Sequence, residues 1–310
     1  MIAEAALRRA LDTVRDHPGL LCLDFGGGRL SAVEIEEGRV AAWTSRELRP
    51  EALPEGAPGD VLRLAGQVHD LVVDAGIDAR RCRMTLPDEA AVSRTVVLPP
   101  MPPRDLGRAM RYAAERHLPF PAHRASWSWD VVERSPSGQR VYLVATWIDV
   151  AERYEQMARA AGLRPEVLEP RSIAVARALG REEAVLIEGG RGRLQLTLVL
   201  EGRPAFVAEA SAGPTDRQRR EALEQLLQRA YRHQAAAGTS GEGGRDPSRG
   251  RPSGRLAPLV IAGDLETAEP DLPLPALRAS ELAAGRLAAP AGFPAGAYLA
   301  NLGLAMRSRR

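Results

Sequence analysis

Two acidic residues stand at equivalent places in a hairpin pattern that occurs twice in the chain. Asp24 lies at the end of an apolar, strand-like run and precedes three glycines, and Glu188 follows a similar run and precedes two glycines. Glycines let backbone N–H groups approach a phosphate closely, and a carboxylate at a strand end can hold a metal ion through water. Each copy continues into an alternating strand, an EG turn and a third strand. The repeat therefore predicts two lobes that face each other across a phosphate-binding cleft.

The elements that must position these acids form a mixed α/β pattern. The two copies of the hairpin unit span residues 20–44 and 183–210. Apolar residues at helical spacing predict helices, the first with Asp60 as its N-cap. The expected helices are 59–75, 104–117, 150–161, 216–237 and 297–306. Further strands are expected over 81–86, 91–98, 127–132, 141–148 and 258–262, and residues 167–179 are expected to pass from strand into helix.

The composition is that of a folded protein. Of the 310 residues, 45% are hydrophobic, and the formal net charge of +2 does not favour a nucleic-acid partner. All 42 basic residues are Arg, so no Lys is available for a Walker-type phosphate grip or a Schiff base. Cys22 and Cys82 lie in apolar runs and are expected to be buried and reduced.

Other classes of function receive no support from the motifs. The histidines lack metal-ligand spacing and there is no Gly-x-Ser-x-Gly elbow, so neither a zinc enzyme nor a serine hydrolase is indicated. The sequence has no apolar run of about 18 residues and no signal-peptide core, which leads us to expect a cytoplasmic protein.

The most specific motifs lie around one helix in the first half of the chain. A strand ends in Leu-Pro-Pro-Met-Pro at 98–102, and the next helix ends in Glu-x-x-Leu-Pro-Phe-Pro at 115–121. With these motifs the chain resembles the PilM family, the actin-like cytoplasmic component of type IV pilus assembly, which is related in fold to the cell-division protein FtsA. The resemblance covers residues 20–206 and resumes at 259–263 and 298–307.

This resemblance implies an α/β protein with the two-lobed actin-like ATPase (ribonuclease H-like) fold, an inserted SHS2-type subdomain and a reduced second-lobe lid. The expected parts are an N-terminal helical extension (1–19), a first lobe (20–86 and 163–182), an insert (87–162), a second lobe (183–210 and 256–310, its final helix packing back on the first lobe), and a charged helix with a disordered-looking loop in place of the lid (211–255).

The family binds ATP between its lobes, at hairpins that read Asp-x-Gly followed by Ser or Thr. Here the hydroxyl-bearing residues are missing: Glu188 replaces Asp, Arg191 or Arg193 stands at the hydroxyl positions, and Asp264 follows the single Gly263 of the third element. We therefore expect a pseudo-ATPase with no catalytic residue and no cofactor. The vestigial nucleotide-binding residues are expected to be Asp24, Gly26, Gly27, Gly28, Arg29, Glu188, Gly190 and Gly263.

Two alternatives stay open at this point. In the first, Arg29, Arg191 and Arg193 replace the lost hydroxyls and clamp phosphates. The chain would then be an active actin-like ATP-binding protein with weak ATPase activity, using ATP and a Mg ion that Asp24 holds through water. In the second, the chain is an unrelated α/β protein and its hairpins are only hairpins.

The resemblance also implies a partner. The family takes the cytoplasmic N-terminal peptide of the membrane protein PilN into a groove beside the insert. The expected function is therefore a scaffold, peripheral to the inner membrane, that binds a PilN-like inner-membrane protein and other pilus platform proteins and no nucleic acid. The candidate partner-binding residues are Leu118, Phe120, Trp127 and Trp129. Packing within the insert is the other role open to the tryptophans.

Overall fold

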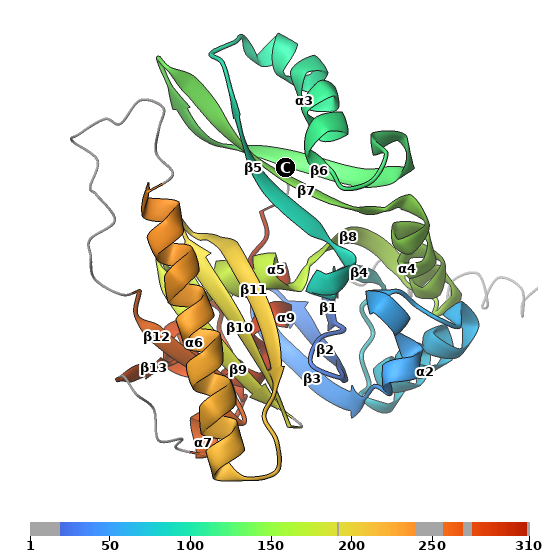
Figure 1. Ribbon diagram of the computed structural model, residues 1–310. Helices are drawn as coiled ribbons and strands as arrows, with labels where there is room; N and C mark the ends of the chain where they lie inside the picture. The colour runs from blue at the N-terminus through green and yellow to red at the C-terminus, as the bar shows by residue number, and fades with distance from the viewer. Residues whose placement is uncertain (1–18, 191, 240–256, 269–274, 309–310) are drawn as a thin grey trace, which may run out of the picture.

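The computed structural model describes residues 19–190, 192–239, 257–268 and 275–308. The expected N-terminal extension up to residue 18, most of the loop after the charged helix, and Arg191 lie outside these residues. The described strands form two sheets of five strands and one sheet of three (Figure 1). Within the described ranges, no helix combines the length and the apolar character needed to cross a membrane.

The first sheet contains the hairpin unit of Asp24 and has the strand order β3-β2-β1-β4-β8. Its strands are β1 (Leu20–Asp24), β2 (Arg29–Glu36), β3 (Arg39–Glu47), β4 (Arg81–Leu86) and β8 (Arg164–Pro170). The first three form an antiparallel meander, and β4 and β8 continue the sheet in parallel. Leu21 and Leu23 point to one face and Cys22 points to the other, because side chains alternate along a strand.

Helices cover both faces of this sheet. On the face of Leu21 lie α2 (Val61–Asp74) and α4 (Ile148–Ala160), and on the face of Cys22 lie α5 (Arg171–Leu179) and α9 (Leu299–Ala305). The expected N-cap of α2 is confirmed, since the Asp60 carboxylate accepts a hydrogen bond from the backbone N–H of Arg63 at 3.0 Å.

The second sheet contains the hairpin unit of Glu188 and has the order β11-β10-β9-β12-β13. Its strands are β9 (Ala184–Gly190), β10 (Arg193–Leu200), β11 (Arg203–Ser211), β12 (Leu259–Gly263) and β13 (Ala276–Arg278). The charged helix α6 (Asp216–Thr239) packs on the face that carries Val185 and Ile187, and the opposite face meets α5 and α9. The short strand β13 was not among the expected elements.

The pair α5 and α9 forms a central layer between the two five-stranded sheets. Both sheets contribute to one hydrophobic cluster with these helices, including Cys22 from the first sheet and Leu186 from the second. The two helices approach closely at Gly303, where a Cβ atom would collide with the carbonyl of Ala174. The final helix therefore packs against both lobes.

The insert is a three-stranded sheet with the order β5-β7-β6, covered on one face by a helix. Its elements are β5 (Val92–Leu98), α3 (Pro103–His117), β6 (Ala125–Ser135) and β7 (Gly138–Trp147). Leu118 and Phe120, at the stop of α3, are only 8% and 9% exposed and belong to the core between the helix and the sheet. Although α4 falls in the range 87–162, it packs against α2 of the first lobe.

Short helical segments complete the fold. They are η1 (Pro50–Ala52), η2 (Pro54–Gly56), η3 (Asp88–Ala90), η4 (Ala122–Arg124), α7 (Leu265–Ala268), α8 (Ala279–Ala283) and η5 (Ala295–Tyr298).

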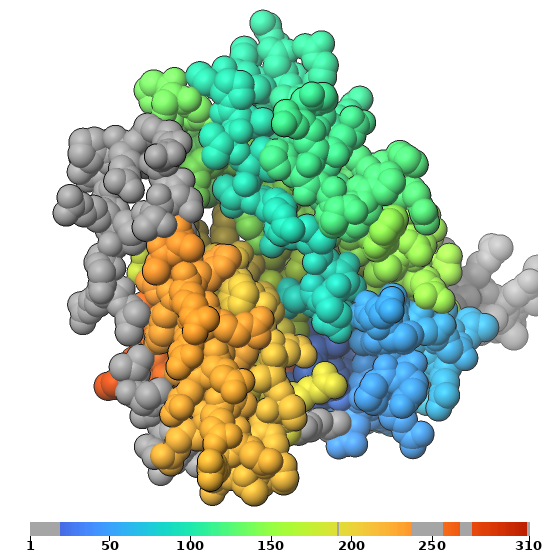
Figure 2. All heavy atoms as spheres, in the orientation of Figure 1, coloured from blue at the N-terminus to red at the C-terminus, as the bar shows by residue number. Residues whose placement is uncertain are grey.

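The insert contacts both lobes. In Figure 2 its teal and green atoms lie above the blue atoms of the first lobe and the orange atoms of the second. Arg203 of β11 pairs with Asp130 of β6 at 3.1 Å. The hydroxyl of Tyr142 on β7 donates to the carbonyl of Pro204 at 3.2 Å. The hairpin β10–β11 of the second lobe is therefore attached directly to the insert.

Both cysteines are buried and free, as expected. Burial raises the pKa of the Cys22 thiol far above its ordinary value and raises the pKa of Cys82 to about 12. Neither thiol is therefore prepared to act as a nucleophile at neutral pH.

Candidate functional site

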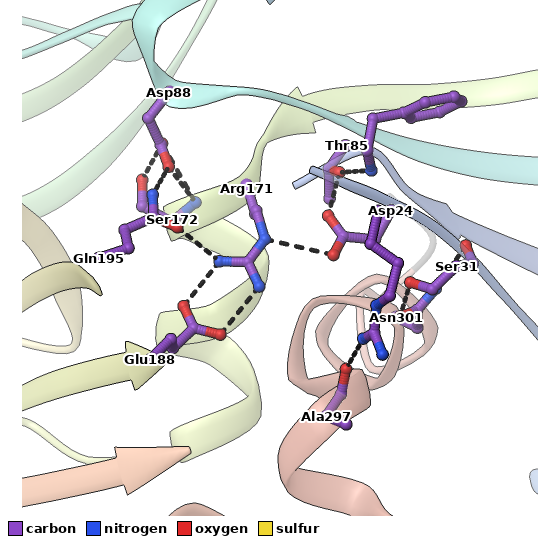
Figure 3. Close-up of polar contacts among 12 residues, drawn as sticks. Asp24, Ser31, Thr85, Asp88, Arg171, Ser172, Glu188, Gln195, Ala297 and Asn301 are labelled. Carbon is purple, nitrogen blue, oxygen red and sulfur yellow. Dashed lines mark hydrogen bonds and ion pairs between the residues drawn. The ribbon is translucent and has the colours of Figure 1, made fainter. Parts of the chain in front are cut away.

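The two acids of the repeated hairpins meet on one arginine. Asp24 ends β1 in the first sheet, Glu188 lies on β9 in the second, and the side chain of Arg171 lies between them (Figure 3). Arg171 is the first residue of α5, the helix packed between the two sheets. A side chain of the protein itself thus stands between the hairpins, where the sequence predicted a phosphate-binding cleft.

The guanidinium of Arg171 donates to both carboxylates. Its two terminal nitrogens donate to the two oxygens of Glu188 at 2.6 and 2.8 Å, and its Nε donates to Asp24 Oδ2 at 3.2 Å. The side chains of Arg171, Asp24 and Glu188 are 10%, 4% and 13% exposed. Bidentate pairs of this kind are among the stronger polar contacts in proteins, since the donors and the acceptors are both charged.

Electrostatics in this cluster favour the charged arginine. Burial alone lowers the pKa of Arg171, but the charges of Glu188 and Asp24 outweigh it and hold the pKa well above its ordinary value. The cluster therefore joins one permanent cation to two carboxylates.

Thr85 completes the surroundings of Asp24. Its hydroxyl donates to Asp24 Oδ1 at 2.6 Å and accepts from the backbone N–H of Phe25 at 3.2 Å. Each oxygen of Asp24 therefore has a donor from within the chain, Thr85 on one side and Arg171 on the other.

A second carboxylate system adjoins the first. Asp88 of η3 accepts from the backbone N–H and the hydroxyl of Ser172, the second residue of α5. Gln195 of β10 links the two systems, because its amide oxygen accepts from Arg171 at 3.1 Å and its amide nitrogen donates to Asp88 at 3.4 Å. Burial raises the pKa of Asp88 to about 6, and the hydrogen bonds from Ser172 limit the rise.

Glycine is needed for different reasons at the three positions after Phe25. At Gly26, a Cβ atom would collide with the Cδ and Nε atoms of Arg171, so this glycine makes room for the arginine. Gly27 and Gly28 have φ values of +64° and +69°, and they form the turn into β2.

Arg29 and Arg193, one from each hairpin, contact residues other than Asp24 and Glu188. Arg29 donates to the carbonyl of Ala297 and lies 5.0 Å from the ring centre of Tyr298. Arg193 has a side chain that is 68% exposed, and it pairs with Glu209 at 3.6 Å. Of the three arginines that the phosphate-clamp alternative requires, these two contact other residues, and Arg191 lies outside the described residues.

In the second lobe, Gly263 is required by the close packing of two strands, whereas Gly190 has room for a side chain. Gly263 has a φ of +64°, and a Cβ atom there would lie 2.7 Å from the carbonyl oxygen of Gly189. The backbone N–H of Asp264 donates to the same carbonyl at 3.0 Å. At Gly190, a Cβ atom would lie 3.9 Å from a carboxylate oxygen of Asp264. The parallel pairing of β12 with β9 therefore accounts for Gly263 without a ligand.

A nucleotide with its magnesium ion would have to compete with Arg171 for the carboxylates of Asp24 and Glu188. Magnesium is usually held in proteins by one or two carboxylates, with several water ligands kept. Every oxygen of Asp24 and Glu188 already accepts a hydrogen bond from Arg171 or Thr85. The hairpins also lack the hydroxyl side chains expected to hold phosphate.

Sequence reasoning did not single out Arg171. It is one of 42 basic residues and lies 147 positions from Asp24. A signal was nevertheless present, because two acids that face each other in a buried position require a neutralising group. The arginine at the start of the helix that precedes the second hairpin was a candidate for that role.

A groove lies between the insert and the first lobe. It is lined by consecutive residues of β6 (126–128) and consecutive residues of β8 (166–168). Both strands are the outer strands of their sheets within the described residues. The groove also takes in three consecutive residues of β7 (144–146), the strand that pairs with β6. Its remaining lining residues are Leu86, Ala91, Ala151, Pro170 and Arg307.

The four candidate partner-binding residues divide between the groove and the core of the insert. Trp127 lines the groove and also packs, half-buried, on the core of the insert. Trp129 packs half-buried on the core that contains Leu118 and Phe120. Leu118 and Phe120 are not among the residues that line the groove.

Comparisons with known proteins connect this geometry to solved structures. No family model matches the chain, and no curated protein matches it. The PilM–PilN type IV pilus biogenesis complex contains a chain that is 20% identical, with a TM-score of 0.69 over 93% of this chain and 97% of that one.

Weaker similarity extends to two other proteins. The cytoplasmic domain of EpsL, an inner-membrane component of the type II secretion system of Vibrio cholerae, is 13% identical, with a TM-score of 0.48 over 94% of this chain and 95% of that one. The ethanolamine utilization protein EutJ from Carboxydothermus hydrogenoformans is 13% identical, with a TM-score of 0.44 over 94% of this chain and 90% of that one.

The match to the PilM–PilN structure spans nearly the whole of both chains. The expected two-lobed α/β architecture is confirmed, with each hairpin unit in its own five-stranded sheet. The chain therefore has the actin-like fold, and it resembles the PilM–PilN structure along almost its entire length.

Proposed function

We propose that the chain is a scaffold of a type IV pilus or related secretion platform at the cytoplasmic face of the inner membrane. In this role it holds a PilN-like membrane protein by that protein's N-terminal peptide, and other platform proteins bind elsewhere on its surface. The observation that carries the proposal is the groove between the outer strands β6 and β8. The likeness in fold to the PilM–PilN complex supports it.

The chemistry of the groove suits an extended peptide. Within the described residues, β6 pairs only with β7, and β8 pairs only with β4. Each therefore presents a backbone edge to which a peptide strand can add. Trp127, Val144 and Leu168 give the groove apolar surface for the side chains of such a peptide. Tryptophan is a frequent anchor of protein interfaces, which makes Trp127 the expected main contact.

The same proposal treats the chain as a pseudo-ATPase. Support comes from Arg171, which satisfies the carboxylates of Asp24 and Glu188 from within the chain. A scaffold of this kind keeps its two lobes in a fixed arrangement with no nucleotide between them. The active actin-like ATPase stays the competing function.

Peptide binding can be measured by fluorescence anisotropy with the labelled N-terminal peptide of the PilN-like protein from the same genome. Trp127→Ala should weaken binding by about tenfold or more, as loss of an interface anchor does. Tyr112→Ala is the control, because Tyr112 is 64% exposed on α3, away from the groove. Equal affinities of wild type and Trp127→Ala, or no binding by wild type, would refute the proposed docking.

Calorimetric titration with ATP and magnesium separates the two functions. The scaffold proposal expects no binding by the wild-type protein. Magnesium-dependent ATP binding that disappears in Asp24→Ala would reject the pseudo-ATPase and favour the active enzyme.

A further inference from the structure

The groove and the Arg171 cluster adjoin each other along two strands. On β8, Pro170 lines the groove, and Arg171 is the next residue. On β4, Leu86 lines the groove, and the residue before it, Thr85, donates to Asp24. A wall residue of the groove is therefore covalently bonded to a member of the cluster on each strand. Because packed interiors transmit displacements between neighbouring groups, a shift of the cluster has to move the wall.

A third connection runs through the segment that follows β4. The backbone N–H and the hydroxyl of Ser172 donate to Asp88. The carbonyl of Ala90, two residues after Asp88, accepts a hydrogen bond from the hydroxyl of Thr146 at 2.6 Å. Thr146 and Ala91 both line the groove. The start of α5 therefore holds the segment 86–91, the rim of the groove, whose end residues Leu86 and Ala91 line it, as well as the cluster.

The far anchor of the cluster lies in the other lobe. Glu188, the bidentate partner of Arg171, belongs to β9 of the second sheet, whereas Asp24 and Thr85 belong to the first. The position of Arg171, and with it the rim and the β8 wall, is therefore set by how the two lobes are held together.

We propose that Arg171 is a positioning residue of the peptide groove. Its guanidinium holds the two lobes together in the place of a bound ligand and so fixes the spacing between the β4–β8 wall and β6. This inference rests on the proposed function for the occupant of the groove, while its effect on the rim can be measured without any peptide.

Arginine is required for this role by geometry. Three nitrogens of Arg171 reach two carboxylates on different sheets at the same time. A lysine ammonium is a compact charge that cannot reproduce the planar bidentate contact with Glu188. Arg171→Lys should therefore resemble Arg171→Met more than wild type.

The test compares wild type with Arg171→Lys, with Arg171→Met and with the triple variant Asp24→Asn/Arg171→Met/Glu188→Gln. Hydrogen exchange of residues 84–91 and 164–172 measures the rim and the wall, and fluorescence anisotropy measures affinity for the PilN-like peptide. Both single variants should raise exchange and weaken peptide binding by about tenfold. The triple variant should regain the unfolding midpoint and keep the weakened binding. The control is Arg46→Met, which removes an exposed ion pair with Asp74 and should change neither readout.

Each outcome decides between a positioning role and a purely structural one. Exchange and affinity within twofold of wild type in both folded single variants would overturn the inference. So would a triple variant that regains affinity together with stability, since the arginine would then act on folding alone. If wild type binds no peptide, the proposed function fails, and the exchange of the rim decides the inference by itself. Should Arg171→Met not fold, Arg171→Lys and the triple variant still carry the comparison.

Discussion

The cleft between the lobes and the groove beside the insert differ in where their polar groups find partners. In the cleft, Asp24 and Glu188 are satisfied by Arg171 and Thr85 from within the chain. The groove is lined by β6 and β8, which are outer strands of their sheets within the described residues. The sequence signal is strongest at the cleft, yet these two outer strands lie at the groove. A repeated motif can thus indicate how a protein is built without marking where it binds.

The largest expected effect tests whether charge pairing closes the cleft. Arg171→Met leaves Asp24 and Glu188 buried without their cation, so the free energy of unfolding should fall by about 3–5 kcal/mol. Urea denaturation measures it. The triple variant with Asp24→Asn and Glu188→Gln should recover most of the loss, because no buried charge is then left unpaired. A loss below about 1 kcal/mol in Arg171→Met would show that the cleft is wet and the cluster is weak.

A smaller effect is expected from the glycine that makes room for the arginine. Gly26→Ala places a methyl group on the Arg171 side chain and should lower the free energy of unfolding by about 1–3 kcal/mol, as overpacking does. The matched control is Gly66→Ala in α2, where a Cβ atom meets nothing within 4 Å, and the change should be neutral or stabilising. Thermal unfolding of both variants checks the pair, and equal stabilities would contradict the close contact.

The smallest effect concerns the carboxylate next to the cleft. The pKa of Asp88 in the folded protein, about 6, lies above its ordinary value of 3.8, so the folded state binds the proton more tightly than the unfolded state. The stability from protonation is therefore present below about pH 4 and is lost as the pH rises through about 6. A pKa change of this size corresponds to at most about 3 kcal/mol. Because Asp88 is only half-buried, solvent screening should reduce the loss over this window to about 1 kcal/mol.

The melting temperature of wild type and Asp88→Asn between pH 4 and 7 measures this loss. Asparagine does not titrate, so the variant should lack this part of the pH dependence. Identical pH profiles in the two proteins would mean that Asp88 is open to solvent. The polar groups beside the cleft would then be exposed to water, as those of the groove are.

Local patterns in the sequence predicted most of the secondary structure and the two lobes. Asp60 caps α2 as expected, because an N-cap depends only on residues within one turn. Both hairpin units form as expected, since alternation and EG turns are local signals. The resemblance carried by the Leu-Pro-Phe-Pro stop pointed to the fold that the comparison with the solved structures confirms.

The site depended on contacts that local patterns do not encode. Arg171 and Asp24 are 147 positions apart, and only the packing of α5 between two sheets brings them together. Leu118 and Phe120 lie in a well-matched motif, but the motif ends α3 and turns these side chains into the core of the insert. The groove is lined by residues of two sheets that are far apart in the sequence, so no local pattern could show it.

The central layer of α5 and α9 has a consequence for the order in which the protein matures on the ribosome. The amide of Asn301 donates to the carbonyls of Cys22 and Ser31 at 2.9 and 3.1 Å. A side chain of α9 therefore forms hydrogen bonds with β1 and β2, which lie far before it in the sequence. During synthesis, the part of the first sheet that α9 covers stays exposed until α9 has emerged. Because β8 belongs to that sheet, the sheet that forms one wall of the groove is complete only when α9 has packed on it.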